Sequence, residues 1–215
     1  MHSESLETLE EVAIEANNAG VKLRGYVSCV AGYCSDEGPI DPKQVAFFTK
    51  TLLNMGCYEV SLGDTTGVGT STILDKLLDE IKKEIPVEKL AIHCHHNDSK
   101  HPYQALSNIL TALSHGISVV DASAAGLGGS PFAEVVCGNV ATEDVVCMLH
   151  WLNIETGIDL PMLVEAGDYI CEAVGRENKS KVAKAFLREQ LKFLNHVDHL
   201  MIRYGLHPPS FPYME

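Results

Sequence analysis

Short apolar runs alternate with longer amphipathic stretches along most of the chain. In the longer stretches apolar residues recur three or four positions apart, which is the helical period. The pattern predicts helices at 5–19, 43–55, 71–84 and 103–115, and strands at 21–30, from 57, from 90 and at 117–122. The connections between successive strands are too long for hairpins, so we expect a parallel sheet.

Residues that favour helix termini support two of these boundaries. Asp41 precedes Pro42, a combination that predicts an N-cap followed by proline at the first helical position. Ser71 or Thr72 is expected to cap the helix that follows the second strand. Both helices should therefore begin close to these residues.

After residue 139 the pattern is helical. Helices are expected at 142–151, 159–175 and 180–204. We assign residues 1–205 to one domain and residues 206–215 to a loose or docked tail. Four strand–helix units amount to half of a (β/α)8 barrel, which takes about 250 residues to close. A complete, open four-stranded sheet is the alternative.

The strand expected from residue 90 ends in two histidines separated by one residue. Because side chains alternate along a strand, His93 and His95 should point to one side of the sheet and Cys94 to the other. The strand at 117–122 leads into the glycine-rich sequence AGLGGS, after which Asn139 offers an amide oxygen. Since the carboxyl ends of parallel strands meet at one edge of a sheet, we predict a metal-capable site there.

Composition and charge narrow the classes of partner. The formal net charge of -13 argues against nucleic acid or an anionic membrane as a partner. A hydrophobic content of 46% indicates a soluble globular protein. Seven cysteines without a CxxC pair indicate reduced thiols, with small core residues expected at Cys29, Cys57, Cys147 and Cys171. The first twelve residues carry four glutamates and no lysine or arginine, unlike a targeting peptide.

Five segments of the chain together resemble one family of enzymes. They are GYVSC, MGCYEVSLGDTTGVGT, AIHCH, SVVDASAAGLGGSPFAEVVCGNVATED and EAGDYIC, and the resemblance covers residues 5–185. They are similar to the 3-hydroxy-3-methylglutaryl-CoA lyase family of metal-dependent TIM-barrel lyases. The GLGG loop with the sequence that follows it is specific to these lyases, whereas the histidine pair also occurs in related condensing enzymes. The resemblance implies an α/β fold, the C-terminal half of a (β/α)8 TIM barrel with four parallel strands and additional C-terminal helices.

The resemblance also implies a reaction and the residues that carry it. Family members cleave 3-hydroxy-3-methylglutaryl-CoA to acetyl-CoA and acetoacetate with Mg2+ or Mn2+. This retro-Claisen cleavage deprotonates a hydroxyl and stabilises an enolate, which requires a Lewis-acid cation and a proton donor. By position the metal ligands are His93, His95 and Asn139, the catalytic residues are His93, Asp64 and Ser130, and the substrate contacts are Ser61, Tyr26, Gly128 and Gly129.

Three features depart from the family pattern. The family's opening strand carries an Arg-Asp pair whose aspartate is a metal ligand, and these 215 residues hold no counterpart of it. Ser130 stands where the family has a loop cysteine, and a serine hydroxyl is a far weaker acid than a thiol, which leaves Cys137 as an alternative proton donor. The sequence HCHHNDSKHPYQAL is longer than its family counterpart, and a zinc site of His93, His95 and His96 is a further alternative.

Two functions of different classes are open at this point. One is metal-assisted cleavage of an acyl-CoA substrate, and the other is a catalytically silent, lyase-like binding partner or a truncated product. The exposed edges of a half barrel predict a homodimer or pairing with the N-terminal half of a lyase. The resemblance implies the mitochondrial matrix, and the lack of a targeting signal makes the cytoplasm the alternative location.

Overall fold

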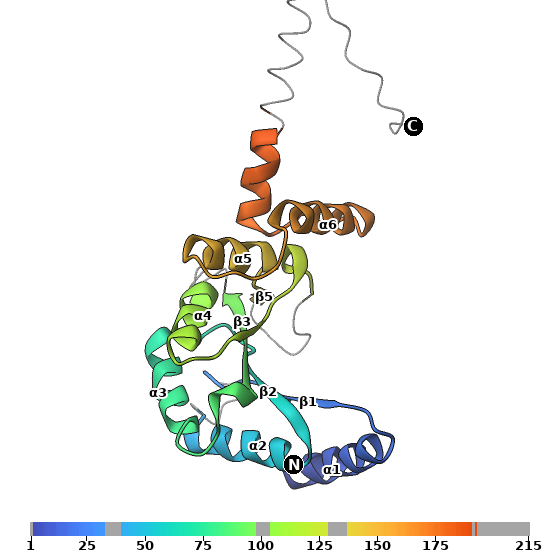
Figure 1. Ribbon diagram of the computed structural model, residues 1–215, viewed down its shortest axis with the longest axis vertical. Coiled ribbons are helices and arrows are strands. Elements are labelled where there is room, and N and C mark those ends of the chain that lie inside the picture. The colour runs from blue at the N-terminus through green and yellow to red at the C-terminus, as the bar shows by residue number, and fades with distance from the viewer. Residues whose placement is uncertain (1, 33–39, 98–103, 129–136, 191, 193–215) are drawn as a thin grey trace, which may run out of the picture.

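Four parallel strands form the centre of the computed structural model, which describes residues 2–32, 40–97, 104–128, 137–190 and 192. The strands are β1 (Leu23–Val27), β2 (Cys57–Asp64), β3 (Leu90–Asn97) and β4 (Val119–Asp121). They lie side by side in chain order, and every neighbouring pair is parallel (Figure 1). The predicted parallel sheet is confirmed, although β1 and β4 are shorter than the apolar runs that contain them.

The helices lie close to their predicted positions. They are α1 (His2–Asn18), α2 (Pro42–Asn54), α3 (Ser71–Ile81), α4 (Gln104–Ser114), α5 (Thr142–Trp151) and α6 (Leu160–Ala173), with 3-10 turns η1 (Val87–Lys89) and η2 (Ala124–Gly126). Residues 181–190 are also helical. The rest of the predicted helix at 180–204, apart from residue 192, and the tail at 206–215 lie outside the described residues. No described helix combines the length and apolar composition that crossing a membrane requires.

The observed N-cap of α2 is the predicted residue, whereas that of α3 is not. Asp41 accepts a hydrogen bond from the Lys43 amide, and Pro42 occupies the first position of α2, as predicted. At α3 the cap is Thr70, whose hydroxyl accepts from the Ile73 amide, so the prediction of Ser71 or Thr72 is wrong. Three adjacent hydroxyl residues are equally good caps by type, and only the backbone geometry selects one of them.

A fifth strand, β5 (Cys137–Asn139), was not predicted. It pairs antiparallel with the end of β3, which brings Asn139 directly opposite His95. β5 has only three residues, and so short a segment shows too little periodicity to be recognised as a strand. The pairing is what places the amide of Asn139 beside the histidines.

The hydrophobic core lies between the sheet and the layer formed by α2, α3 and α4 (Figure 1). α3 is amphipathic, and its four leucine and isoleucine positions that face the sheet repeat at helical spacing and are buried. The core positions of the central elements are Val60, Leu62, Leu90, Ile92, Leu74, Leu77, Leu78, Ile81 and Ile109. Alternate strand residues therefore leave the opposite face of the sheet for polar side chains.

One cysteine differs from the expectation of reduced thiols. Cys29, just after β1, is disulfide-bonded. A CxxC motif identifies only cysteines that are separated by two residues, so its absence does not exclude other disulfides. Cys57, Cys94, Cys147 and Cys171 are free, and the last of these is buried like Cys94.

Candidate functional site

The two histidines at the end of β3 lie side by side. The ring centroids of His93 and His95 are 4.7 Å apart, and the rings meet edge to face. Cys94, between them, is completely buried on the other side of the sheet. This arrangement is the strand alternation that the sequence predicted.

Main-chain carbonyls fix the inner nitrogen of both rings. His93 Nδ1 lies 3.1 Å from the carbonyl oxygen of Asp121, and His95 Nδ1 lies 3.1 Å from that of Asp64. A carbonyl can only accept, so the neutral ring carries its hydrogen on Nδ1 and its lone pair on Nε2. Burial, and next the neighbouring His93, lowers the pKa of His95, which favours the neutral form that a metal ligand needs.

Asn139 completes this cluster from β5. Its amide nitrogen donates to the carbonyl of Leu127 at 2.7 Å, so the amide oxygen is the end directed toward His95. Gly128 has a φ of 85°, and a side chain there would begin 3.2 Å from the Asn139 amide nitrogen. The close approach requires glycine, which supports a role for Gly128 in the site. Gly129 and Ser130 lie outside the described residues.

Glu143 at the start of α5 supports the loop that leads to Asn139. Both of its carboxylate oxygens lie 2.9 Å from the amide nitrogen of Ala125, which adopts a left-handed φ of 54°. Glu143 is fully buried, and burial raises its pKa. Gly167 leaves the space for this carboxylate, since a Cβ there would lie 2.3 Å from its oxygen. From the sequence, Glu143 was expected only to lie at the start of a helix.

Asp64, predicted to be catalytic, lies on the helix-facing side of the sheet. It pairs with Cys94, whereas Gly63 pairs with His93, so its carboxylate points away from the two imidazoles. The carboxylate accepts hydrogen bonds from the Gly69 amide at 3.1 and 3.3 Å. Burial raises the pKa of Asp64 to about 6. In this geometry Asp64 contacts His95 through its main-chain carbonyl.

The two predicted substrate contacts on β1 and β2 belong to a polar network on the histidine side. Ser61 is fully buried, and its hydroxyl donates to Asp121 at 2.6 Å. Tyr26 is 58% exposed, and the Arg24 guanidinium lies over its ring at 5.0 Å. Arg24 also forms a bidentate ion pair with Asp121, with distances of 2.8 and 2.9 Å. Arg24 and Asp121 were missed because they are 97 residues apart in sequence.

The donor set can hold a divalent cation but is incomplete. It consists of two imidazole nitrogens and one amide oxygen, all neutral. Among the described residues, no three His, Cys, Asp or Glu side chains converge in a way that would hold a metal ion. The zinc alternative built from His93, His95 and His96 is therefore wrong for this structure. The side chain of Cys137 lies outside the described part of the chain, so its proposed role stays a prediction.

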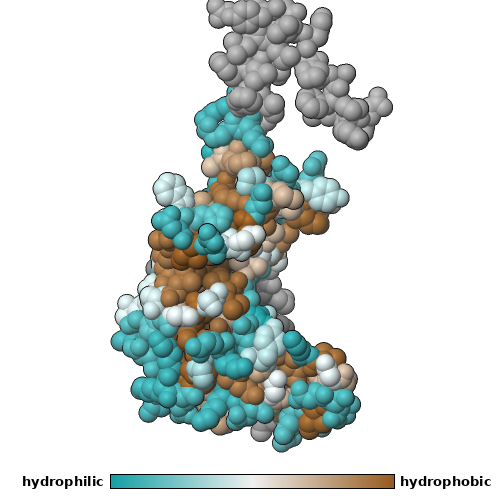
Figure 2. Space-filling view, viewed as in Figure 1, coloured by the Kyte–Doolittle hydropathy of each residue, from teal (hydrophilic) through white to brown (hydrophobic). Residues whose placement is uncertain are grey.

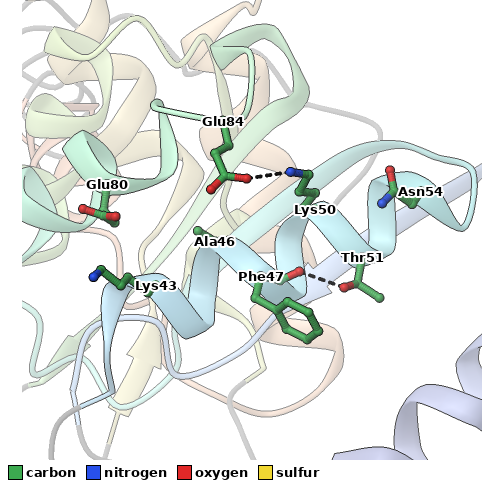
Figure 3. Close-up of a pocket in the computed structure, with 8 residues that line it drawn as sticks. All are labelled: Lys43, Ala46, Phe47, Lys50, Thr51, Asn54, Glu80 and Glu84. Carbon is green, nitrogen blue, oxygen red and sulfur yellow. Dashed lines mark hydrogen bonds and ion pairs between the residues drawn. The ribbon is translucent and has the colours of Figure 1, made fainter.

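A separate pocket of about 500 Å3 lies between α2 and α3 and contains none of the predicted site residues. Lys43 and Lys50 of α2 lie on the same side as Glu80 of α3 and Glu84 after it, and Lys50 and Glu84 form an ion pair of 2.6 Å (Figure 3). Both side chains of this pair are more than half exposed. The pocket therefore contains a solvated ion pair, and such a pair gives no indication of a ligand.

Comparisons with known proteins agree on one group of relatives. Residues 2–170 match the HMGL-like family. A cytoplasmic 3-hydroxy-3-methylglutaryl-CoA lyase of Danio rerio is 52% identical over 182 residues, which are 85% of this chain and 53% of that protein. The mitochondrial hydroxymethylglutaryl-CoA lyase of Bos taurus is also 52% identical over 182 residues, with 85% and 54% covered. The crystal structure of hydroxymethylglutaryl-CoA lyase from Pseudomonas aeruginosa has a TM-score of 0.81 and 47% identity, covering 87% of this chain and 61% of that chain.

The chain spans about half the length of the curated relatives that it matches. The matched region contains the four parallel strands and all the described site residues. The predicted α/β fold, part of a TIM barrel, is confirmed by the likeness to a solved lyase. On this evidence the chain belongs to the HMGL-like family.

Proposed function

We propose that the chain carries half of a metal-assisted site that cleaves 3-hydroxy-3-methylglutaryl-CoA to acetyl-CoA and acetoacetate. The observation that carries the proposal is the convergence of His93, His95 and Asn139 at the carboxyl ends of the strands. The two rings present Nε2 lone pairs because their Nδ1 hydrogens are engaged by carbonyls. This arrangement is typical of histidines that bind a metal.

The cation would be Mg2+ or Mn2+, held by His93, His95 and Asn139. Lyases of this family are metal-dependent. When bound, the cation polarises the substrate hydroxyl and carbonyl oxygens and stabilises the developing enolate. His93 can serve as a ligand or as a proton carrier, but not both at once, because the same Nε2 lone pair is used in either role. Ser130 would supply the proton at the loop, where the family has cysteine.

The site needs further ligands to be complete. Mg2+ and Mn2+ prefer carboxylate oxygen, and the three ligands of this chain are neutral, so the cation is expected to bind weakly here. β1 and β4 are the outer members of the described parallel sheet, and a similar half sheet could pair in parallel with both. We propose a homodimer, or pairing with the N-terminal half of a lyase, as the complete form.

The test is release of acetoacetate from 3-hydroxy-3-methylglutaryl-CoA by the purified chain, with Mn2+ and after chelation. Metal-dependent release that is lost in His95→Ala supports the proposed function. A folded sample without turnover, alone or mixed with the N-terminal half of a lyase, contradicts it. Light scattering of the same sample checks the dimer, because a single monomeric species with a cooperative melt would contradict the pairing.

A catalytically silent binding partner is the second candidate. The neutral donor set and Ser130 in place of a cysteine favour it, because both weaken the chemistry and leave the fold intact. A change in the turnover of a full-length lyase on mixing, without turnover by the chain itself, would identify this role. The relatives include mitochondrial and cytoplasmic lyases, and we propose one of these two compartments for this chain.

A further inference from the structure

Asp121, the last residue of β4, contacts the other three parallel strands. Its carboxylate accepts hydrogen bonds from Arg24 on β1 and Ser61 on β2, and its carbonyl faces His93 on β3. We propose that Asp121 is a positioning residue for His93: the clamp on its carboxylate directs its carbonyl to His93 Nδ1 and keeps the Nε2 lone pair in the site. The inference rests on the proposed function, because it concerns the role of His93 there.

The clamp on the carboxylate uses both of its oxygens. Arg24 donates to one oxygen at 2.8 Å and to the other at 2.9 Å, and Ser61 donates to the first at 2.6 Å. Arg24 is itself held by Glu59 at 2.6 Å and by a hydrogen bond with Tyr26. The side chains of Arg24 and Asp121 are 19% and 25% exposed, so water competes little for these contacts. A bidentate pair in such surroundings allows one orientation.

The carbonyl of Asp121 needs this support because the strand ends there. β4 has only three residues, and the pair His93 with Asp121 is the last of its ladder with β3. Beyond it Ser123 forms a single bridge with Ala141, and the chain then enters the turn at η2. The end of a short outer strand opens more readily than the centre of a sheet, so a side-chain contact there helps to hold the backbone in place. The clamped carboxylate provides that restraint, because it is only three bonds from the carbonyl carbon of the same residue.

The same device occurs on the other side of β3. Asp64 is the last residue of β2, its carboxylate is held by the Gly69 amide, and its carbonyl faces His95 Nδ1. Each histidine of the pair is thus oriented by the carbonyl of a strand-ending aspartate whose carboxylate is anchored elsewhere. The repetition on both neighbours of β3 is what a site that needs two Nε2 lone pairs would require.

A direct role of Asp121 as a metal ligand fits less well. Its two carboxylate oxygens already accept three hydrogen bonds, two from Arg24 and one from Ser61, and Arg24 neutralises its charge. No metal-capable cluster of three such side chains is found in the described parts of the chain, which include Asp121 and both histidines. Asp121 therefore acts on the site through His93.

The test compares wild type with Asp121→Asn in the full chain, without metal. Nitrogen–proton NMR correlations of the imidazole rings, recorded at about pH 8 where ordinary histidines are neutral, report which nitrogen carries the hydrogen. The His93 signal is assigned as the one lost in His93→Gln. We expect the Nδ1–H form in wild type and a mixture with the Nε2–H form in Asp121→Asn. Mn2+ affinity should fall about tenfold, as when the outer partner of a ligating histidine is lost.

The matched control is Asp75→Asn, which removes a carboxylate 2.8 Å from the imidazole of His115 on the helix layer. It should move only the His115 signal and leave Mn2+ affinity unchanged. If Asp121→Asn does not fold, Arg24→Lys keeps the charge and breaks the bidentate contact, with the same expected shift. An unchanged His93 tautomer in a folded variant overturns the inference. Because this readout needs neither metal nor substrate, it decides the inference even if the wild-type chain binds no Mn2+ and the proposed function fails.

Discussion

The two faces of the parallel sheet are made by alternating residues of the same strands, yet they differ in what completes them. On the helix-facing side, Val60, Leu62 and Ile92 are fully buried against helices of this chain. On the histidine side, charged groups satisfy one another, and Tyr26 remains 58% exposed. The helix-facing side is covered by helices of the described structure, whereas the histidine side carries part of a site.

This difference implies that stability and site chemistry are largely separable. The apolar face supplies the burial that drives folding. On the polar face, the attraction between charged side chains is largely offset by the cost of removing them from water, so this face adds little to stability. Apolar side chains also gather over α4 and α5 (Figure 2), where a groove of about 350 Å3 is lined by residues that include Leu110, Met148 and Leu152. That surface belongs to the helix layer and contains no predicted site residue. Five substitutions at four positions test how far the separation holds.

The largest effect is expected for Leu62→Ala, on the helix-facing side of β2. Leu62 is fully buried. Loss of its side chain leaves a cavity and should lower the free energy of unfolding by about 2–5 kcal/mol. Urea denaturation followed by circular dichroism measures the change. A loss below about 1 kcal/mol would contradict the tight packing assigned to this face.

The next effect is expected at Glu143, which links the core to the loop of the site. Glu143→Ala leaves the buried amide of Ala125 without an acceptor and should cost about 1–3 kcal/mol. Thermal and urea unfolding measure this loss. The same variant should weaken Mn2+ binding, because the turn that orients Asn139 is released. Normal Mn2+ affinity at reduced stability would mean that the turn does not reach the site.

Glu143→Gln separates the charge of this residue from its shape. The pKa of Glu143 is raised in the folded protein, so its contribution to stability is fully present below its ordinary pKa of 4.5 and is lost as pH rises through the higher folded value. The unfolding free energy of wild type minus that of Glu143→Gln should therefore fall as pH rises from about 4 to neutrality. Denaturation series at several pH values measure it. A difference that stays constant or grows would show that burial does not penalise the ionised form.

A smaller effect on stability, with a large one on binding, is expected for His95→Ala. Removing one of two imidazoles should weaken Mn2+ binding at least about tenfold. The unfolding free energy should change by only about 1 kcal/mol, the contribution of one hydrogen bond. Titration calorimetry and urea denaturation provide the two numbers. Unchanged Mn2+ affinity would remove His95 from the proposed ligand set.

The smallest effect is expected for Lys50→Met, in the pocket between α2 and α3. The ion pair with Glu84 is 2.6 Å long but exposed on both sides. Such pairs contribute about 0–1 kcal/mol, so the melting temperature should barely move. Mn2+ affinity should stay at the wild-type value. A loss comparable to that of Leu62→Ala would show that the surface charges and the core are coupled.

The sequence by itself determined the order of the four parallel strands and the helices, and the common side of His93 and His95. Both follow from local periodicity, since apolar spacing marks the elements and strand alternation places side chains. The family-specific loop also predicted Asn139 as a member of the site, and the structure brings it beside His95. These features depend on residues that are close together in the chain.

Only the tertiary structure decided which partners these residues meet. Asp64 was placed beside the metal by resemblance, but its register with Cys94 turns the carboxylate to the helix layer. The Arg24 to Asp121 pair joins residues 97 positions apart, and β5 forms only because β3 offers it an edge. The hydrophobic pattern restricts the register so that one face stays buried, but which residues then meet depends on strands that are far apart in the sequence. The anchoring of each histidine by a neighbouring strand is accordingly a property of the folded sheet.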